Sequence, residues 1–364
     1  MKIAAKYFNH TFDLRFGEVE IANGVVVRAR EIPGGDVANA PYLLPGLCDI
    51  HTHGNSGLDF TFAPYDGWVA MARFLFQHGV TRFSAATLAL GEEKLTKMCE
   101  TARRFYETAP EGCAKLAGIT LEGPFLSYAK RGAQNEAHLV DPDYDLYARL
   151  QRASGGLIKI VCVAPELPGA MEFIRRVSKE AKVALAHTDC EYEQAAEAFE
   201  SGVTHVTHLF NAMRPMHHRA PGPIPAASER ESVTAELIAD GVHVHPAMVR
   251  AAYRLFGADR LCLISDAMAA CGMADGEYEL GEQKVFVKNG RATLAGGAIA
   301  GSTATLWDCM KNALSLGIPL ADAVRMAAAN PRRVMDIALP VVQEGERADF
   351  ALCDDGFNIR NVYA

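Results

Sequence analysis

Short apolar runs alternate with longer amphipathic stretches along most of the chain, beginning just after Pro45. Three of the stretches, at residues 66–79, 191–202 and 246–257, repeat their apolar positions with a helical period and end in glycine. The apolar runs have the length of buried strands, and there are eight: residues 47–53, 79–87, 115–123, 157–166, 182–188, 204–210, 232–240 and 260–267. Eight strands alternating with helices predict an α/β chain with a (β/α)8 barrel, a fold of about 250 residues. A doubly wound open sheet is the alternative.

The two ends of the chain show a different pattern. Residues 1–45 alternate short apolar and polar segments without a helical period, and turns are expected at Asn23-Gly24 and Gly34-Gly35. The tail, residues 342–364, returns to strand character. We expect it to join the N-terminal strands in one small discontinuous β domain, which leaves residues 46–341 for the barrel domain.

Two further segments follow the eighth apolar run. Residues 276–296 predict a β-hairpin inserted into the barrel domain, with its turn at Asn289-Gly290. Residues 303–316 and 319–329 have a helical period and are expected to complete the ring of helices.

The composition is that of an ordinary globular protein, with 49% hydrophobic and 22% charged residues among 364. A formal net charge of -8 argues against a nucleic-acid partner or a membrane surface, which require a basic face. The N-terminal residues lack the apolar core and cleavage site of a secretory signal, so we expect a cytoplasmic protein. Nine cysteines without a CxxC pair indicate reduced thiols.

Five of the eight predicted strands end in a side chain that can bind a metal. The first ends in His51 and His53, whose spacing puts both imidazoles on one face of a strand. The other four strands contribute one side chain each: Glu122, His187, His208 and Asp266. A single histidine at a strand end is more often structural than a ligand. In a barrel, however, these strand ends meet at the active-site rim. Four imidazoles and two carboxylates suit zinc or, with more carboxylate, iron or manganese.

Several motifs resemble those of a known family. The stretches similar to the amidohydrolase superfamily and, within it, to the N-acetylglucosamine-6-phosphate deacetylases are PGLCDIHTHG, LEGPF, AHT, THLFNAM, ADGVHV, ISDAM and NPRRVMDI. LEGPF and THLFNAM are far more specific than the HxH pair alone. The resemblance implies a metal-dependent TIM barrel with a small β-sandwich made from both termini, in agreement with the pattern of strands.

The resemblance also implies how the ligands divide between two metals. The principal metal would be held by Glu122, His187 and His208. A second metal would share Glu122 as a bridge and use the rest of the set: His51, His53 and Asp266. One or two divalent ions per subunit are implied, with zinc as the first choice and Fe2+ or Mn2+ as alternatives. Asp266 would act as general base and general acid around a metal-activated water, or alternatively cap the turn after its strand.

The implied activity is hydrolysis of N-acetyl-D-glucosamine 6-phosphate to D-glucosamine 6-phosphate and acetate. The resemblance assigns sugar and phosphate contacts to Asn211, Ala212, Arg219 and His243. The guanidinium of Arg219 would reach the neighbouring subunit's site, which implies a homodimer. Gln134 stands where some relatives place a substrate-contacting histidine, and glutamine can donate a hydrogen bond but carries no charge.

Three other activities remain open at the level of the sequence. The same chemistry could act on N-acetylgalactosamine 6-phosphate. A different amidohydrolase reaction, such as cyclic amide hydrolysis or deamination, is a second alternative. The third is a non-catalytic sugar-phosphate sensor, against which the complete ligand set and Asp266 argue.

Overall fold

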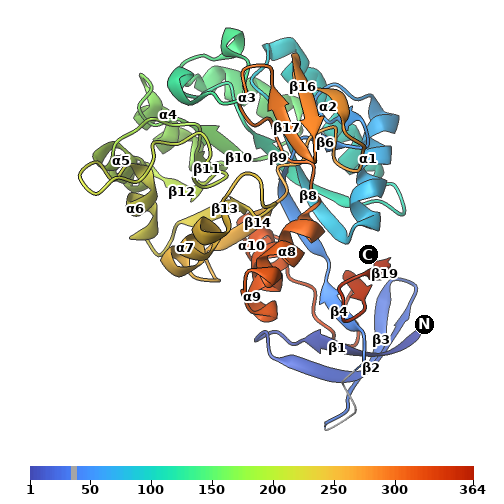
Figure 1. Cartoon of the computed structure of the whole chain (residues 1–364). Coiled ribbons are helices and arrows are strands. Elements are labelled where there is room, and N and C mark those ends of the chain that lie inside the picture. Colours follow the sequence, from blue (N-terminus) through green and yellow to red (C-terminus); the bar gives the residue numbers. More distant parts are fainter. Residues whose placement is uncertain (34–38) are drawn as a thin grey trace.

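Eight parallel strands form the centre of the larger part of the molecule in the computed structural model, which describes residues 1–33 and 39–364 (Figure 1). Their order around the sheet follows the sequence: β5 (Leu47–Thr52), β8 (Val80–Ala86), β9 (Lys115–Leu121), β10 (Ile158–Val163), β11 (Lys182–Leu185), β12 (Val203–Val206), β13 (Thr234–Ile238) and β14 (Leu261–Ile264). Each of them overlaps one of the eight predicted runs, and neighbours in this order pair in parallel.

The ring closes where β14 meets β5. The backbone N–H of Asp266 donates to the carbonyl of His51 at 3.0 Å, and Thr52 forms a parallel bridge with Ala267. The buried carboxylate of Asp49 accepts a hydrogen bond from the N–H of Ser265 at 3.2 Å across the same seam. The predicted (β/α)8 barrel is therefore confirmed, and the open sheet is excluded.

Helices cover the outside of the ring (Figure 1). The main ones are α1 (Tyr65–Gln77), α2 (Glu92–Thr108), α3 (Tyr144–Ala153), α4 (Ala170–Val177), α5 (Tyr192–Ser201), α6 (Pro223–Ser228), α7 (Pro246–Phe256) and α8 (Leu306–Ser315). Apolar residues at helical spacing bury one face of each; in α1 these include Trp68, Met71 and Leu75. The segment predicted as one helix at 319–329 is divided into α9 (Leu320–Val324) and a π-helical turn (Arg325–Ala329), and α10 (Asn330–Val334) follows.

Strands from both ends of the chain form a second, six-stranded sheet. Its order is β19 (Ile359–Tyr363), β18 (Phe350–Cys353), β4 (Tyr42–Pro45), β1 (Lys2–Phe8), β2 (Leu14–Ala22) and β3 (Val25–Glu31). Its apolar side chains enclose a separate small core, which includes Val19, Leu43 and Phe350. The expected joining of the two termini is confirmed and is consistent with the predicted β-sandwich, while the domain boundaries stay a prediction.

The predicted turns have left-handed backbone at the expected places. Asn23 and Gly24 have φ values of 51° and 69°, as the tight turn between β2 and β3 requires. Asn289 and Gly290 adopt the same conformation between β16 (Gln283–Lys288) and β17 (Arg291–Leu294). The predicted hairpin at 276–296 has a third strand, β15 (Gly276–Leu280), so the insert is a three-stranded antiparallel sheet. The turn predicted at Gly34-Gly35 lies outside the described residues.

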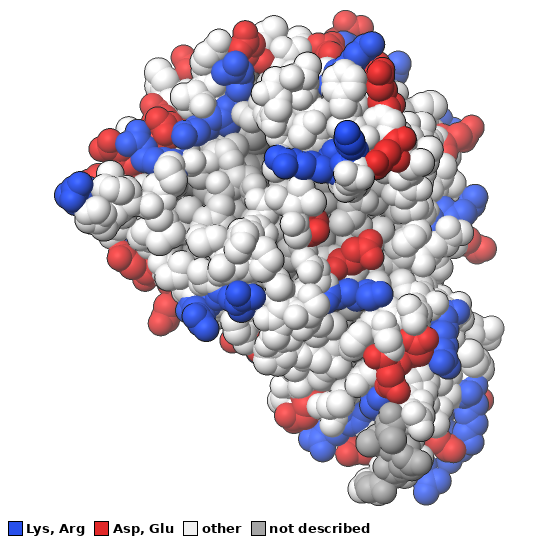
Figure 2. Space-filling model, viewed as in Figure 1, with Lys and Arg blue, Asp and Glu red and all other residues white. Residues whose placement is uncertain are grey.

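Charge and burial agree with the bulk composition. On the face that Figure 2 shows, basic and acidic side chains are interspersed among uncharged ones. All nine cysteines are buried free thiols. Within the described part of the chain, every helix is too short or too polar to pass through a bilayer.

A buried arginine ties the barrel to the small sheet. One terminal nitrogen of Arg332 donates to the carbonyl of Gly46, the hydroxyl of Thr81 and the carboxylate of Asp349 at 3.1, 2.9 and 2.9 Å. Arg332→Met would leave the buried carboxylate of Asp349 with Arg82, at 3.2 Å, and the hydroxyl of Thr81 as its side-chain partners, and so with one cation in place of two. We expect a loss of about 3 kcal/mol in the free energy of unfolding.

The urea unfolding midpoint followed by circular dichroism measures this effect. The matched control is Arg325→Met, which removes an arginine paired at 3.0 Å with a largely exposed Asp259. Exposed ion pairs contribute at most about 1 kcal/mol. Equal midpoints for the two variants would contradict the structural role of Arg332.

Candidate metal centre and active site

The backbone places the six predicted side chains at one rim of the barrel. His51 lies within β5, and Glu122 directly follows β9. His53 directly follows β5. The remaining three side chains each lie two residues beyond a strand and have left-handed backbone, with φ values of 42° at His187, 28° at His208 and 49° at Asp266. Side chains other than glycine adopt this conformation at a cost of about 1–3 kcal/mol, and such residues concentrate at functional sites.

Three side chains form the first group of candidate ligands. Glu122 Oε1 lies 3.1 Å from His187 Nε2 and 2.9 Å from His208 Nε2, and the two nitrogens are 3.0 Å apart. All three residues are buried. Ligands on a tetrahedral metal with bonds of about 2.0–2.1 Å lie roughly 3.3 Å apart, close to this triangle.

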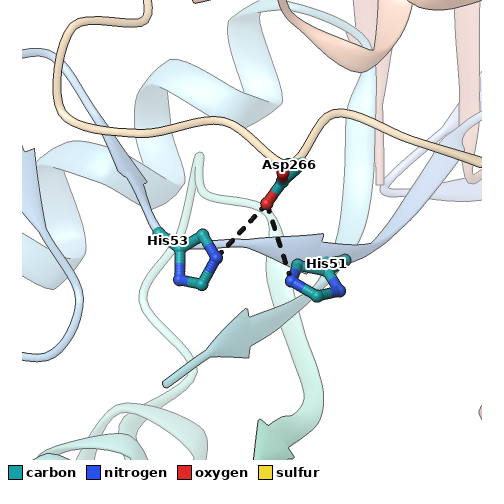
Figure 3. Close-up of side chains that lie close together, drawn as sticks. All are labelled: His51, His53 and Asp266. Atoms are coloured by element: carbon teal, nitrogen blue, oxygen red, sulfur yellow. Dashed lines mark ion pairs between the residues drawn. The ribbon is translucent and has the colours of Figure 1, made fainter. Parts of the chain in front are cut away.

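The second group is drawn in Figure 3. His51 and His53 project from the same side of β5 toward Asp266, which comes from the loop after β14. Asp266 Oδ1 lies 3.6 Å from His51 Nε2 and 3.2 Å from His53 Nε2. The two groups meet at Glu122, whose Oε1 is 3.5 Å from His51 and whose Oε2 is 3.2 Å from His53.

The hydrogen bonds of the imidazoles show that this site fits a cation. The Nδ1 of His187 lies 2.8 Å from the carbonyl of Lys130, which can only accept, so the proton of a neutral ring sits on Nδ1. Its Nε2 lone pair then faces the carboxylate of Glu122. Two electron-rich atoms at this distance repel each other unless a proton or a metal ion lies between them. Nitrogen and carboxylate donors in this arrangement are those that zinc prefers.

The pKa values of the site also show that its carboxylates favour a positive charge beside them. Burial lowers the pKa of His51, but the carboxylates of Glu236 and Glu122 outweigh burial and hold it well above its usual value. Burial likewise opposes the charged form of His53, while Asp266 and Glu122 raise its pKa to about 9. Burial raises the pKa of Glu122, but His51 and the hydrogen bonds from His187 and His208 hold it well below the usual range. Binding of a metal therefore has to displace protons from these rings.

Two residues that the sequence analysis did not identify lie behind this site. Glu236 in β13 is completely buried, and its Oε2 lies 3.0 Å from His51 Nδ1. His205 in β12 is also buried, and its Nε2 is 3.1 Å from Glu236 Oε1. The available signal was a single carboxylate within an otherwise apolar strand, at residues 234–238.

Gln134 is part of the site and orients Glu122. Its side-chain amide donates to Glu122 Oε2 at 2.8 Å, and its carbonyl oxygen accepts from the backbone N–H of Ala89 at 2.7 Å. Because these two bonds fix which end of the amide faces Glu122, Gln134 presents a donor to the carboxylate. Gln134 also lines the cavity above the candidate ligands.

A cavity of about 250 Å³ lies over the metal-competent side chains. The predicted substrate contacts Asn211, Ala212 and His243 line it, together with the loop at 298–301. His243 Nδ1 lies 2.7 Å from the carboxylate of Asp240, which leaves Nε2 as the nitrogen available to a ligand. Arg219 is not part of this cavity: it lies in an exposed turn, with its guanidinium 2.7 Å from His218 Nε2.

The amidohydrolase family profile matches residues 42–364. An N-acetylglucosamine-6-phosphate deacetylase from Bacillus subtilis is 40% identical over 71% of this chain, and the match spans 66% of that relative's length. An N-acetylgalactosamine-6-phosphate deacetylase from Escherichia coli O157:H7 is 30% identical over 95% of this chain and 93% of its own.

Among solved structures, a mutant N-acetyl-D-glucosamine-6-phosphate deacetylase from Mycobacterium smegmatis, in complex with N-acetyl-D-glucosamine-6-phosphate, superposes with a TM-score of 0.91. It is 36% identical, and the alignment covers 99% of this chain and 96% of that one. The fold, the metal-competent rim and these relatives agree: the chain belongs to the amidohydrolase family, among the N-acetylglucosamine-6-phosphate deacetylases.

Proposed function

We propose that this protein hydrolyses N-acetyl-D-glucosamine 6-phosphate to D-glucosamine 6-phosphate and acetate. The observation that carries the proposal is the convergence of four imidazoles and two carboxylates beneath one cavity, in a chain whose relatives are named for this reaction. The reaction for which the relatives are named acts on a small molecule, and we propose the cytoplasm as its location.

The residues present fit one or two divalent ions per subunit, with zinc as our first choice and Fe2+ or Mn2+ as alternatives. Glu122, His187 and His208 would hold the principal ion, and His51, His53 and Asp266 would complete the second position with Glu122 shared. A bound divalent ion lowers the pKa of water to about 7 and polarises an amide carbonyl.

Asp266 is our candidate for the group that moves the proton. Burial raises the pKa of its carboxyl, but the hydrogen bond from His53 and the charge of His51 hold it below the usual value, so the carboxylate is free to accept a proton at neutral pH. Asp266 also lines the cavity, within reach of a substrate. It would take the proton of the attacking water and then donate it to the amine nitrogen of the leaving sugar, as a general base and general acid.

The remaining contacts would bind and orient the sugar phosphate. His243, held by Asp240, borders the cavity together with Asn211 and Ala212, and these residues would contact the sugar phosphate without requiring a basic surface. Gln134 would keep Glu122 oriented, and the side chain of Gln134, which lines the cavity, would face the substrate.

The single experiment that tests the proposal is an acetate-release assay. N-acetylglucosamine 6-phosphate should be the best substrate, with activity abolished by a chelator and restored by zinc. For N-acetylglucosamine, which lacks the phosphate, we expect kcat/KM to be at least about 10²-fold lower. Each charge-assisted hydrogen bond to the phosphate contributes roughly 1.5–3 kcal/mol, and 1.36 kcal/mol corresponds to a factor of ten in rate. The absence of acetate release from this substrate by a zinc-loaded preparation would refute the proposed reaction, and full activity of a metal-free preparation would refute its dependence on a metal.

Deacetylation of N-acetylgalactosamine 6-phosphate is the second candidate. It is favoured by the relative from Escherichia coli O157:H7, whose match spans nearly the full length of both chains. Comparing kcat/KM for the two epimers in the same assay decides between them.

We further propose a homodimer in which Arg219 reaches the phosphate in the neighbouring subunit. Its exposed position outside the cavity of its own chain supports this arrangement. Arg219→Ala is expected to lower kcat/KM for the phosphorylated substrate about 10–100-fold, because a charge-assisted fork is lost. The small activity on the unphosphorylated sugar should be unchanged. An equal loss with both substrates, measured in parallel, would show that Arg219 does not bind the phosphate.

A further inference from the structure

Glu236 is a completely buried carboxylate that contacts both groups of candidate ligands from behind. Its Oε2 lies 3.0 Å from His51 Nδ1, in the second group, and 3.1 Å from the backbone N–H of His208, in the first. Its Oε1 lies 3.1 Å from His205 Nε2. Three hydrogen-bond donors therefore converge on one side chain of β13 at the floor of the site.

The contact with His51 determines which ring nitrogen can bind a metal. A carboxylate accepts hydrogen bonds, so the proton of the neutral His51 ring sits on Nδ1. Nε2 is then left with its lone pair and points toward Glu122 and Asp266, and it is buried without a hydrogen-bond partner among the described residues. A carboxylate behind a histidine in this way fixes the tautomer and the orientation of the ring and increases the basicity of the ligating nitrogen.

The other imidazoles lack this support. The Nδ1 of His187 faces a backbone carbonyl, and the Nδ1 atoms of His53 and His208 are buried with no partner in the described part of the chain. His208 is held through its backbone instead, and the acceptor is again Glu236. Because His208 has left-handed backbone, with φ of 28°, this bond stabilises a conformation that the residue would otherwise leave readily.

His205 fixes the remaining oxygen of Glu236. Its other ring nitrogen, Nδ1, lies 2.6 Å from the hydroxyl of Thr234, so the ring is anchored at both ends. A carboxylate held on both oxygens cannot rotate away from His51.

We propose that Glu236 is a positioning residue that joins the two halves of the metal centre, by orienting His51 for the second ion and holding the backbone of His208 for the first. This inference rests on the proposed function, because it assumes that the rim binds metal. It adds a residue that touches neither metal nor substrate and acts only through the ligands.

Two variants of the full-length protein separate charge from geometry. Glu236→Gln keeps the volume and one acceptor oxygen, so we expect zinc affinity at the second position to fall about 10-fold. Glu236→Leu removes both acceptor oxygens, so we expect zinc affinity at the second position to fall about 100-fold. The second ion should then dissociate when the protein is passed through a gel-filtration column. The readouts are zinc per chain by mass spectrometry and affinity by chelator competition. Circular dichroism confirms folding.

The matched control is Asp240→Asn, which alters another carboxylate with a buried side chain, just after the same strand, that contacts His243 and Ser302 and no candidate ligand. This variant should keep both ions and show a raised KM. Two ions at wild-type affinity in folded Glu236→Leu, or a single ion in the wild-type protein, would overturn the role of Glu236. A wild-type protein that is active without any ion would instead refute the proposed function itself.

Discussion

Glu122→Ala is expected to remove bound metal from both positions and to lower kcat/KM by about 10³-fold or more. The two oxygens of Glu122 together lie within 3.5 Å of all four imidazoles of the rim. Without it, four buried rings face one another with Asp266 as the remaining carboxylate of the set. Polarisation by a metal contributes several kcal/mol to catalysis, and each 1.36 kcal/mol corresponds to a factor of ten in rate.

Zinc per chain and acetate release from the same preparation check this expectation. Glu107→Ala is a suitable control, since Glu107 is an exposed carboxylate in the last turn of α2 that pairs with Arg103. It should change neither quantity. A Glu122→Ala protein that still carries two ions would show that this carboxylate is not the shared ligand.

The second large effect is expected for Asp266→Asn, which should lower kcat about 10²–10⁴-fold while substrate still binds. Asparagine keeps the shape of aspartate but cannot accept a proton, so the variant removes general base and general acid together. Its side-chain oxygen can still face His53. The principal ion, which depends on the other group of ligands, should remain.

Steady-state kinetics measures the effect on catalysis, and calorimetric titration with the substrate measures the effect on binding. A dissociation constant near that of the wild-type protein with strongly reduced kcat supports proton transfer by Asp266. Retention of more than about a tenth of the wild-type kcat would rule out that role, because general acid–base catalysis contributes at least about 10²-fold.

The eight barrel strands could be predicted because each is a short apolar run that is buried on both faces, a property that the residues themselves carry. The three-stranded sheet inserted after the eighth barrel strand was harder to predict from the sequence. Strand β15 is mostly exposed and polar, and only its pairing with β16 makes it a strand. The helix predicted at 319–329 is divided in the structure, because the chain widens into a π-helical turn at Arg325–Ala329 and then continues through Pro331 in α10.

Within the site, the predictable residues are those at strand ends, because barrel topology alone brings such positions to one rim. Glu236 could not be identified this way, since it lies inside β13 and its pairing with His51 joins residues far apart in sequence. Its strand neighbour two positions on, Ile238, belongs to the apolar interior of the ring, so the alternation of the strand points Glu236 inward as well. A lone acid on such an inward face was the usable signal.

No sequence pattern predicted the left-handed backbone at His187, His208 and Asp266. None of the three is glycine, the residue that adopts this conformation without steric cost. The surrounding hydrogen bonds impose it, for example the one that the N–H of Asp266 donates to the carbonyl of His51. Such geometry depends on the closed ring and is absent from any single segment.

The six-stranded sheet also bears on how the polypeptide is made. Strand β4 leads directly into the first barrel strand, yet one of its neighbours, β18, is synthesised only after all eight barrel strands. During translation, the backbone N–H and C=O groups of Leu43 and Leu44 that face β18 therefore stay without their hydrogen-bond partners until residues 350–353 have been synthesised. Prematurely terminated products would carry this open edge permanently, which marks them for chaperones and proteases.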